Sequence, residues 1–551
     1  MNNYKSVIKL IPYIKEKKFI FFLGIFGILI SSLLYLPVPY ITGNIVGNLF
    51  VTKSSLKEVI FYCLFVLFLY VLKFFITIFS KSLFIKLQII ITNKIRIDMI
   101  KKIIDLPMEY FNSNENGYIL SRINECSNIG NIFSPNIISV LLSQLECIFT
   151  IITMFILNVN LSLFLFIMLP IIFFITKYFS ELLNKNTRKL LDKNAYLNSG
   201  IFEMLNGIVH IKYLNAKDIY INKLKNKIND VVLSSTSQNK SIMFFTENIS
   251  LINNIFTILL MLISSFLIFD NKITLALYVS FSGYLVKVIS NIQSFANLGI
   301  TLKPICVSID RVTEFFSLED EFTKKEIFLN EPIKSIEFLD LNFRYNSNDE
   351  FLFNDINFEL YSNDKILLMG DNGSGKSTLI KLLLGLYKNY KGNIIINGYN
   401  LRKINPLSLR KRIGIVSQDI FLFKGTVLEN ILYNNDNCNE KDVENLINKL
   451  GIKDYINNFN NGLKTELIGN NSGISGGQKQ IIAFLRAILN KKDVLILDEA
   501  TSNLDNKTKN RINSLLETNQ FCNILIIISH EDRKYKFINK TICVNKELSL
   551  C

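Results

Sequence analysis

The stretch GDNGSGKST, residues 370–378, follows an apolar run at 366–369 and precedes a second apolar run at 379–386. This order predicts a strand, a tight turn and then a helix. Glycines let such a turn point several backbone N–H groups at one anion, and the helix start adds partial positive charge. The spacing therefore predicts a phosphate-binding loop. Its residues are Gly370, Asp371, Asn372, Gly373, Ser374, Gly375, Lys376, Ser377 and Thr378.

Two side chains of this loop have individual predicted roles. Lys376 has the length to reach the β- and γ-phosphates of a nucleotide, and the hydroxyl of Ser377 is placed to bind Mg²⁺. A chance turn of glycine and serine is the alternative, and the flanking strand and helix argue against it. The stretch therefore indicates a nucleotide and Mg²⁺ as cofactors.

Length and composition limit the class of protein. A chain of 551 residues is expected to hold more than one domain, and 49% hydrophobic residues are too many for an ordinary soluble protein of this size. The net charge of +15 beside apolar runs indicates a cytoplasmic membrane face rather than a nucleic-acid partner. Two histidines exclude a histidine-based metal site, and eight scattered cysteines are expected to be free thiols.

Six apolar runs lie in the first half of the chain. Each is near the length needed to cross a hydrocarbon core of about 30 Å, so the sequence predicts six membrane crossings. The sixth run is the weakest, because it contains Lys287. The runs are 19–36, 59–79, 137–157, 161–176, 249–269 and 273–300.

Charges between the runs predict their orientation. Lysine and arginine are concentrated before the first run, between the second and third, and between the fourth and fifth. The alternate connections, 158–160 and 270–272, are short and nearly bare of basic residues, with Lys272 as the single one. By the positive-inside rule, both termini are cytoplasmic and the protein is a multi-pass protein of the cell membrane. The two long basic connections predict helices that continue past the membrane into the cytosol.

The second half has a different pattern. From about residue 335, short β-type runs at 394–397, 414–417, 494–497 and 524–529 alternate with helical patterns. This alternation predicts an α/β domain with a largely parallel sheet. We therefore predict a six-helix transmembrane domain at 1–310, a charged linker at 311–332 and a nucleotide-binding domain at 333–551.

Acidic and amide side chains follow two of these predicted strands. The run 494–497 ends at Asp498 and Glu499. Asp498 is expected to hold Mg²⁺, directly or through water, and Glu499 to polarise an attacking water as general base. Gln418 follows the predicted strand 413–417, where its amide can touch Mg²⁺ and that water. A strand end that merely meets solvent is the alternative for the two acids alone.

Two further motifs complete the predicted site. The stretch ISGGQ at 474–478 predicts a second glycine-rich anion cradle at a helix start. Its residues are Ser475, Gly476, Gly477 and Gln478. His530 follows the apolar run 524–528, which is the placement needed to contact a γ-phosphate.

This order of motifs resembles the ATP-binding cassette (ABC) family. The resemblance rests on the phosphate loop, Gln418, ISGGQ, the run LILDEATSNLD at 495–505 and the pair Ser529-His530. Tyr345 matches the family's aromatic residue that stacks on adenine. The stretches 106–122 and 203–212 resemble the two intracellular loops of a six-helix, exporter-type half transporter. The fold this implies is an all-α six-helix membrane domain followed by an α/β P-loop ATPase.

The resemblance also implies a mechanism. Two cassettes close head to tail, and each ATP with its Mg²⁺ lies between one subunit's phosphate loop and the other's Ser475-Gly476-Gly477. The protein therefore needs a second half transporter as partner. Glu499, Ser475 and His530 are all present, which favours a homodimer over a heterodimer. Coupling to the membrane domain runs through the two intracellular loops, whose turns are expected near Gln418.

The function implied is ATP-driven export of an amphiphilic small molecule, a lipid or a peptide by alternating access. An importer on the same scaffold and an ATP-gated regulator or channel are the alternatives. The sequence as given has no cysteine-protease region before the first run, so we expect no leader cleavage. The signature has Ile474 where the family usually has leucine, and 469–473 lacks the usual Glu-Arg pair.

Ionisable residues inside the crossings are candidates for contact with substrate. Glu146 lies near the middle of the third run and Lys287 lies in the sixth. We hypothesise that they face the translocation pathway as a pair. Lys73 and Lys177 are interpreted as snorkelling to the inner interface, and His210 as structural.

Overall fold

The computed structural model describes residues 10–550 with internal gaps, and each of its two compact units is described by itself. The gaps are 48, 50–55, 115, 323–325, 346–348, 372, 434, 436, 469–472, 519–520, 530–534 and 545–547. Unit 1 comprises Met1–Ile104 and Ser113–Leu318, and unit 2 comprises Asp105–Asn112 and Glu319–Cys551.

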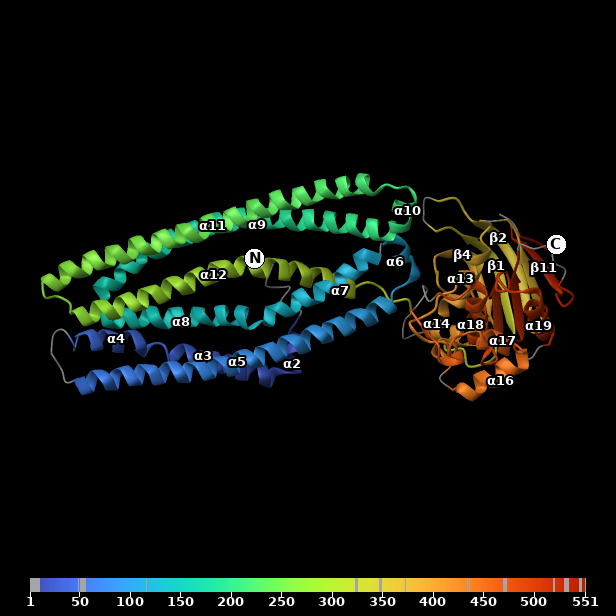
Figure 1. Cartoon of the computed structure of the whole chain (residues 1–551), viewed down its shortest axis with the longest axis horizontal. Helices are drawn as coiled ribbons and strands as arrows, with labels where there is room; N and C mark the ends of the chain where they lie inside the picture. The colour runs from blue at the N-terminus through green and yellow to red at the C-terminus, as the bar shows by residue number, and fades with distance from the viewer. Residues whose placement is uncertain are drawn as a thin grey trace. The chain divides into compact units, whose positions relative to one another are not determined.

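Unit 1 is helical in its described residues (Figure 1). Its α-helices, with the α6 segment that bridges the two units, are α2 (Ile11–Lys15), α3 (Lys18–Leu33), α4 (Pro37–Gly47), α5 (Leu56–Ile104), α6 (Met108–Ser113), α7 (Asn116–Gly130), α8 (Pro135–Leu157), α9 (Val159–Asn206), α10 (Ile208–Tyr213), α11 (Lys217–Phe269) and α12 (Leu275–Phe316). A 3₁₀ turn, η2 (Asn131–Phe133), joins α7 to α8.

Four of these helices are longer than a membrane is thick. Helix α5 has 49 residues, which at 1.5 Å per residue is roughly 74 Å, more than twice the hydrocarbon core. The helices α9, α11 and α12 have 48, 53 and 42 residues. The predicted continuation of helices beyond the apolar runs is therefore confirmed. Helix α9 also continues through Pro170.

The apolar runs lie almost entirely within helices, apart from 34–36 and 273–274. In the described part of the chain, five helical stretches are long and apolar enough to cross a membrane: Lys18–Gly47, Leu56–Ile104, Gly117–Leu157, Lys217–Phe269 and Leu275–Phe295. The predicted fourth crossing, 161–176, lies in α9, where the side chains of 164–169 are outside the described residues.

Polar caps make the short connections between crossings. The side chain of Asn158 accepts a hydrogen bond from the backbone N–H of Leu161, so α8 ends and α9 begins at one residue. Thr274 caps α12 in the same way, through Leu277 N–H. A short polar residue at each turn satisfies helix N–H groups that have no partner inside the helix.

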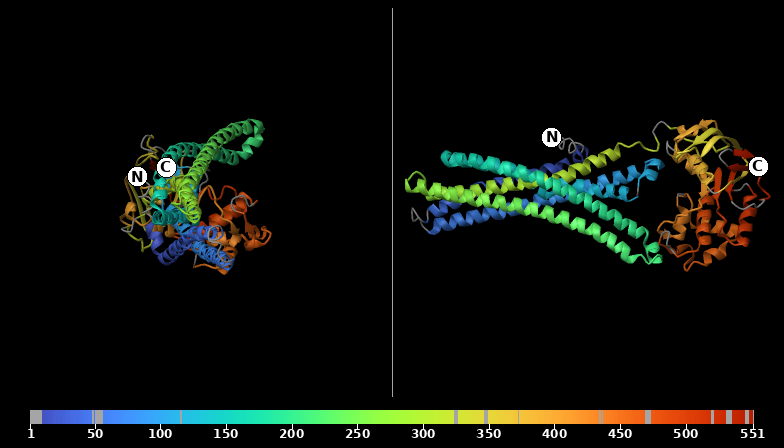
Figure 2. Two further views of the ribbon diagram at one scale, coloured as in Figure 1. Left: turned by 90° about the vertical axis from the view of Figure 1, so that its left-hand side faces the viewer. Right: turned by 90° about the horizontal axis from the view of Figure 1, so that it is seen from above.

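Helix pairs in unit 1 pack through small residues. Helix α9 packs along α11, α12 packs against α4 and α8, and α3 packs against α5 (Figure 2). A Cβ atom on Gly24 would lie 2.8 Å from the ring of Phe84, and one on Gly43 would collide with Ser280. Glycine therefore sets how closely these helices approach.

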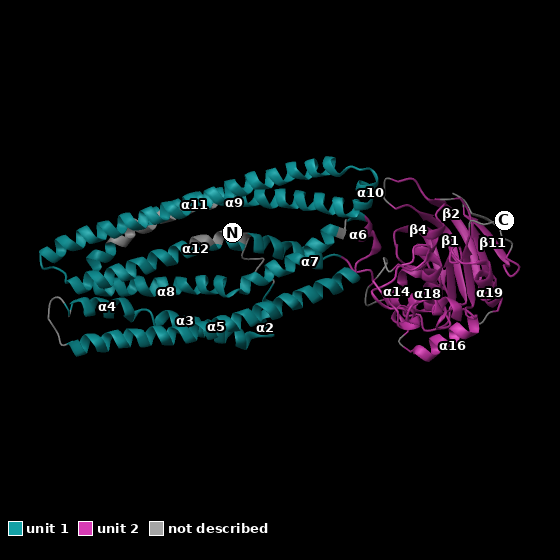
Figure 3. Cartoon of the chain, in the orientation of Figure 1, with its two compact units in different colours: residues 1–104, 113–318 teal, residues 105–112, 319–551 magenta. Residues whose placement is uncertain are grey.

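The described residues of unit 2, shown in magenta in Figure 3, form three sheets. The six-stranded sheet has the order β12-β11-β3-β10-β9-β6, and its strands are parallel except for β12. The four-stranded sheet, β2-β1-β4-β5, is antiparallel, and β7 pairs with β8. The strands are β1 (Ser335–Phe343), β2 (Phe353–Tyr361), β3 (Lys365–Met369), β4 (Tyr390–Ile396), β5 (Tyr399–Asn400), β6 (Ile413–Val416), β7 (Gly425–Thr426), β8 (Glu466–Leu467), β9 (Val494–Asp498), β10 (Ile524–Ile528), β11 (Lys540–Val544) and β12 (Leu548–Leu550).

The parallel sheet is confirmed, with one correction. The run 394–397 was predicted to belong to it, yet it lies mainly in β4 of the antiparallel sheet. Apolar runs do not reveal which sheet a strand joins, because partner choice depends on long-range pairing. Every residue of β9 and β10 is buried, as expected for parallel strands covered on both faces.

The helices of unit 2 cover this sheet. They are α13 (Lys376–Leu383), α14 (Pro406–Arg412), α15 (Val427–Leu432), α16 (Glu440–Leu450), α17 (Lys453–Asn457), α18 (Gly476–Ile488) and α19 (Asn506–Leu516), with the 3₁₀ turns η3 (Leu401–Lys403) and η4 (Gly462–Lys464).

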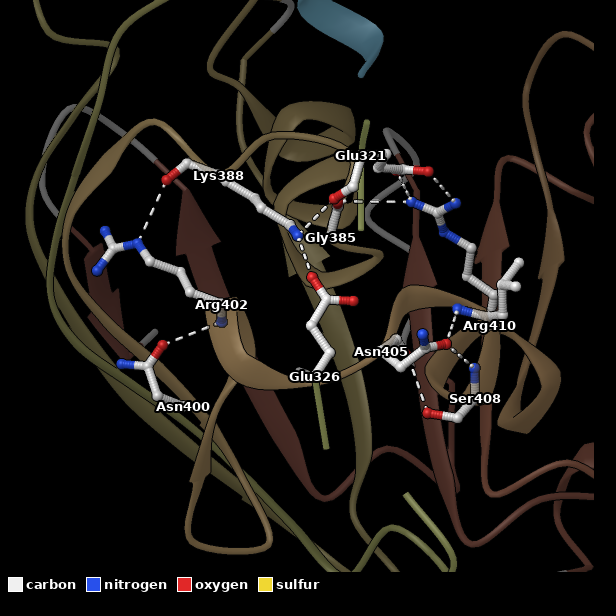
Figure 4. Close-up of polar contacts among 10 residues, drawn as sticks. Glu321, Glu326, Gly385, Lys388, Asn400, Arg402, Asn405, Ser408 and Arg410 are labelled. Carbon is white, nitrogen blue, oxygen red and sulfur yellow. Dashed lines mark hydrogen bonds and ion pairs between the residues drawn. The ribbon is translucent and has the colours of Figure 1, made fainter. Parts of the chain in front are cut away.

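Part of the charged segment predicted as a linker is bound to unit 2 (Figure 4). Glu321 forms an ion pair with Arg410, and Lys388 Nζ lies 2.9 Å from Glu326 Oε1. Lys388 also donates to the carbonyl oxygen of Glu321, at 2.6 Å. Residues 311–316 are helical and belong to α12 of unit 1.

The expectation that every cysteine is a free thiol is wrong for Cys543, which is disulfide-bonded. Cys543 lies in β11, and the antiparallel pairing with β12 brings the end of the chain back beside it. That proximity has no signature in the spacing of the sequence. The other described cysteines are free: Cys63, Cys126, Cys147, Cys306, Cys438 and Cys522.

Candidate nucleotide site

The phosphate loop lies between β3 and α13, as predicted. Gly375 has φ +99°, and a Cβ atom there would lie 2.6 Å from the ring of Phe353. Gly370 has φ +150°, and a Cβ atom there would collide with the carbonyl oxygen of Val544. Both positions therefore require glycine, because L side chains rarely adopt these backbone angles and no room exists for one.

Lys376 folds back over its own loop. Its ammonium donates to the carbonyl oxygens of Gly370, at 2.7 Å, and Asp371, at 2.8 Å, and the residue is 6% exposed. Burial lowers the pKa of Lys376, and the nearby Glu499, Asp498 and Asp371 oppose that shift. The ammonium therefore lies in the loop that phosphates are predicted to occupy.

A buried hydroxyl in the same loop fits a phosphate ligand. Ser374 Oγ has no hydrogen-bond partner among the described residues. A buried hydroxyl without a partner is unfavourable unless a ligand or water completes it. Together with the glycine cradle and Lys376, it makes the loop suitable for a nucleotide's phosphates.

Strand ends bring the metal candidates together. Strands β3, β9 and β6 share the parallel sheet, so the residues that follow them gather at one edge. Ser377 Oγ donates to Asp498 Oδ2 at 3.1 Å, and Gln418 Nε2 donates to Glu499 Oε2 at 3.0 Å. The described residues contain no group of three His, Cys, Asp or Glu side chains that could hold a metal. Hydroxyl, amide and single carboxylate oxygens are the set that Mg²⁺ uses alongside substrate phosphates.

The loop after Asp498 is held by a residue that sequence reasoning missed. Gln480 in α18 is 3% exposed and donates to the carbonyl oxygen of Glu499 at 3.3 Å and to Ser502 Oγ at 3.0 Å. Its own carbonyl oxygen accepts from Asn503 N–H at 3.0 Å. Glu499 itself has φ +51°, an uncommon angle for a non-glycine residue that these contacts hold in place. The only sequence signal was a polar residue two positions after the signature motif.

Tyr345 lies beside the phosphate loop. Its hydroxyl lies 2.7 Å from Thr378 Oγ1, and its ring contacts the rings of Phe343 and Tyr387 edge-on, at centroid distances of 5.1 and 5.5 Å. The residue is 45% exposed. Thr378, Phe343 and Tyr387 therefore hold the Tyr345 ring in place, and its exposed part is accessible for stacking with a base.

One cavity brings together half of the predicted site residues. Its volume is about 280 Å³, and its lining comes from the phosphate loop, the strand ends and Tyr345. The lining residues are Tyr345, Leu352, Gly373, Gly375, Lys376, Ser377, Thr378, Gln418, Asp498, Glu499 and Ile528.

The signature residues are not among the described residues that line this cavity. Ser475 begins α18 with a capping box, in which Gln478 N–H donates to Ser475 Oγ and Ser475 N–H donates to Gln478 Oε1. A Cβ atom on Gly477 would lie 2.8 Å from the carbonyl oxygen of Asn503. The structure thus divides the predicted residues into two sets within one chain. The predicted residues Asn372 and His530 lie outside the described residues.

Residues 105–112, which include the start of the stretch predicted as the first intracellular loop, belong to unit 2. Met108 packs against the core of that unit, and Asn112 Nδ2 donates to the hydroxyl of Tyr387 at 2.6 Å. Tyr387 in turn contacts Tyr345. This segment therefore contacts Tyr387 and the core of unit 2, and the expected place of the loop turns near Gln418 stays a prediction.

Comparison with known families agrees with this architecture. The model of the ABC transporter transmembrane region matches residues 21–292, and the ABC transporter model matches residues 353–502. This chain belongs to the ABC transporter family. It is a multi-pass membrane protein with a helical transmembrane domain followed by the family's α/β ATP-binding domain.

Several curated proteins are similar to this ABC transporter. The lactococcin-A transport/processing ATP-binding protein LcnC of Lactococcus lactis subsp. lactis is 28% identical over 428 residues. The transport/processing ATP-binding protein ComA of Streptococcus pneumoniae is 28% identical over 433 residues. In both comparisons the match covers 77% of this chain and 60% of the relative, so this chain spans well under two thirds of their length. The uncharacterized ABC transporter ATP-binding protein YknV of Bacillus subtilis is 26% identical, over 96% of this chain and 88% of the relative.

A solved structure shares the fold. It is that of a bacterial Atm1-family ABC exporter with ATP bound, which matches with a TM-score of 0.84 over 96% of this chain and 93% of that one. Its sequence identity is 19%, so this likeness concerns the fold alone.

Proposed function

We propose that this ABC transporter is an ATP-driven exporter that works as a dimer of half transporters by alternating access. The observation that carries the proposal is the cavity in which Lys376, Ser377 and Gln418 meet Asp498 and Glu499. A phosphate cradle, magnesium-type oxygen ligands and a candidate base in one cavity are the parts that phosphoryl transfer to water needs.

In this proposal each residue of the cavity has a role. The loop amides, Ser374 and Lys376 bind the phosphates of ATP, and Tyr345 stacks on adenine. The carboxylate of Glu499 polarises the attacking water, and its link to Gln418 holds both side chains toward that water. Ser377, Asp498 and Gln418 hold Mg²⁺, which neutralises charge on the phosphates. Asn372 and His530 keep the roles their motifs predict, in the phosphate loop and at the γ-phosphate.

The dimer follows from the separation of the two residue sets. Because Ser475 to Gln478 do not line their own chain's cavity, we propose that they complete the cavity of a second copy. ATP held between two chains favours the closed pair over the open one, which is the differential interaction a conformational change requires. A homodimer is the simplest arrangement, since one chain carries both halves of the site.

The charge pattern supports an orientation with both termini in the cytoplasm, where ATP is available. The exposed apolar side chains along α3, α5 and α11 support contact with membrane lipids, for example at Phe26, Phe75 and Phe266. We propose an amphiphilic small molecule, a lipid or a peptide as the substrate class. The similarity to LcnC, a lactococcin-A transport/processing protein, supports the peptide among these classes.

Substitution of the candidate base tests this proposal. We expect Glu499→Gln to abolish steady-state ATP hydrolysis while ATP still binds, because the amide cannot accept a proton. Inside-out vesicles with the unsubstituted chain should accumulate a cargo from a panel of lipids, dyes and peptides, and vesicles with the variant should not. Full turnover by the variant would refute the role of Glu499, and uptake that is independent of ATP would refute export.

A further inference from the structure

An ion pair lies inside the apolar part of unit 1. Lys287 Nζ of α12 is 3.2 Å from Glu146 Oε2 of α8, which confirms that these two residues pair. Glu146 is 5% exposed, whereas 22% of the Lys287 side chain is exposed. Within this pair, Glu146 is therefore buried and Lys287 is partly accessible.

A second lysine joins this pair through an aromatic ring. Lys73 Nζ of α5 lies 4.5 Å from the ring centroid of Tyr35, and Lys287 Nζ lies 4.8 Å from the same centroid. The ammonium of Lys73 therefore packs on the same ring as Lys287, and its interpretation as a snorkelling side chain stays a prediction. Cation–π contact stabilises both ammonium groups but neutralises neither.

The charges of this cluster do not balance. It holds two ammonium groups and one carboxylate, and Lys73 has no ion pair within the described part of the chain. An unneutralised charge within a membrane-spanning segment is unfavourable by several kcal/mol unless it finds a partner. The cluster therefore favours an added anion.

Two buried polar atoms near the pair also have no partner among the described residues. Glu146 Oε1 is one, and Asn291 Nδ2 is the other. Asn291 is 4% exposed and lies one helical turn after Lys287, so both side chains leave the same face of α12. An acidic oxygen of a ligand would neutralise the charge of Lys73 and accept a hydrogen bond from Asn291 Nδ2. A donor on the ligand would satisfy Glu146 Oε1.

We propose that Tyr35, Lys73, Glu146, Lys287 and Asn291 bind the anionic head group of an amphiphilic substrate. This inference rests on the proposed export function and names its substrate class. Lys73 pairs with the carboxylate or phosphate, Asn291 donates to it, and Glu146 keeps Lys287 in place. A purely structural ion pair between α8 and α12 would account for Glu146 and Lys287. It would leave Lys73 without a role.

Binding of a matched pair of amphiphiles tests the site. The full chain is placed in phosphatidylcholine nanodiscs without nucleotide at pH 8, and binding of laurate is compared with that of methyl laurate. We expect laurate to bind about tenfold more tightly, since the ester has the same chain without the charge. Lys73→Met should remove this preference and leave ester binding unchanged, and Lys73→Arg should keep it.

The matched control is Lys177→Met, which removes an exposed lysine of α9 outside the cluster and should change neither affinity. Nanodiscs with added phosphatidylglycerol identify the source of the anion. If this lipid competes with laurate, bilayer lipid occupies the site, and if it does not, the site prefers a free amphiphile.

Equal affinities for laurate and its ester would overturn the inference, as would equal effects of Lys73→Met and Lys177→Met. Far-UV circular dichroism of each sample reports whether a variant has folded, since unit 1 is helical, and if Lys73→Met has not, the laurate-to-ester ratio of the unsubstituted chain decides. Because no ATP is used for amphiphile binding, laurate preference without transport contradicts only the proposed function. Transport without laurate preference contradicts only the inference.

Discussion

Gln480 is a buried amide that holds the backbone of Glu499, the residue proposed as general base. Its side chain spans the backbone of Glu499 and the hydroxyl of Ser502, and it is nearly inaccessible to solvent. The position of Glu499 therefore depends on Gln480, a residue that does not itself line the cavity.

We expect Gln480→Ala to lower kcat for ATP hydrolysis about tenfold or more while the affinity for ATP stays nearly unchanged, because a displaced base affects only the chemical step. Steady-state kinetics and equilibrium ATP binding separate the two. The control is Asn435→Ala, which removes a second buried amide of unit 2 that is bonded to Ile431 and Arg486 instead. An equal loss of kcat in both variants would contradict a positioning role.

The glycines of the phosphate loop allow a matched comparison. Gly373 and Gly375 both have positive φ, but an added Cβ atom on Gly373 meets nothing within 4 Å, whereas one on Gly375 meets Phe353. We expect Gly373→Ala to cost about 1–2 kcal/mol of backbone strain alone, and Gly375→Ala to cost more and to weaken ATP binding strongly. Thermal unfolding and ATP titration measure both, and equal losses would refute the steric argument.

At the scale of elements, helix caps hold the active edge of unit 2. The side chain of Asp505 caps α19 by accepting from Thr508 N–H at 3.1 Å, and it also accepts from the hydroxyl of Tyr455. Hydrogen bonds from Tyr455 and Thr508 lower the pKa of Asp505 to about 2. These hydrogen bonds therefore fix the position of Asp505, at the end of the loop that begins at Asp498.

This lowered pKa predicts a pH dependence. A carboxylate whose pKa is lower in the folded state stabilises that state above its unfolded pKa, and the contribution is lost as pH falls. We expect the stability difference between the unsubstituted chain and Asp505→Asn to be full above about pH 4 and to vanish as pH falls toward 2. Unfolding midpoints of both proteins across that range check it, and a difference that persists at pH 2 would argue against the ionised cap.

At the scale of the whole molecule, the separation of the two residue sets makes a distinct prediction about pairing. In a tandem of two fused copies, Lys376→Ala in one copy and Ser475→Arg in the other damage the same shared site and leave the second site intact. Placing both substitutions in one copy damages both sites. ATP trapping should retain about half of its stoichiometry in the first tandem and fall to near zero in the second. The reverse result, near zero in the first tandem and about half in the second, would mean that each chain completes its own site.

Much of the architecture could be predicted from local pattern. The phosphate loop between a strand and a helix, the strands that end at Asp498 and Ile528, and the apolar runs are encoded by neighbouring residues, so they were visible in the sequence. Gln480 was not, because a buried amide inside a helix has no spacing that sets it apart. The antiparallel sheet and the disulfide at Cys543 were missed because both depend on strand pairing between distant segments.

By itself, the sequence determined which segments are helix, strand or turn and which residue types bind phosphate, since these depend on periodicity and on backbone freedom at glycine. Only the tertiary structure decided which of those residues meet. Ser377 reaches Asp498 across 121 positions, and Lys73 and Lys287 share the ring of Tyr35 from separate helices. These contacts arise because parallel strands end at a common edge and helices pack side by side. Neither arrangement can be inferred from the spacing of neighbouring residues in the sequence.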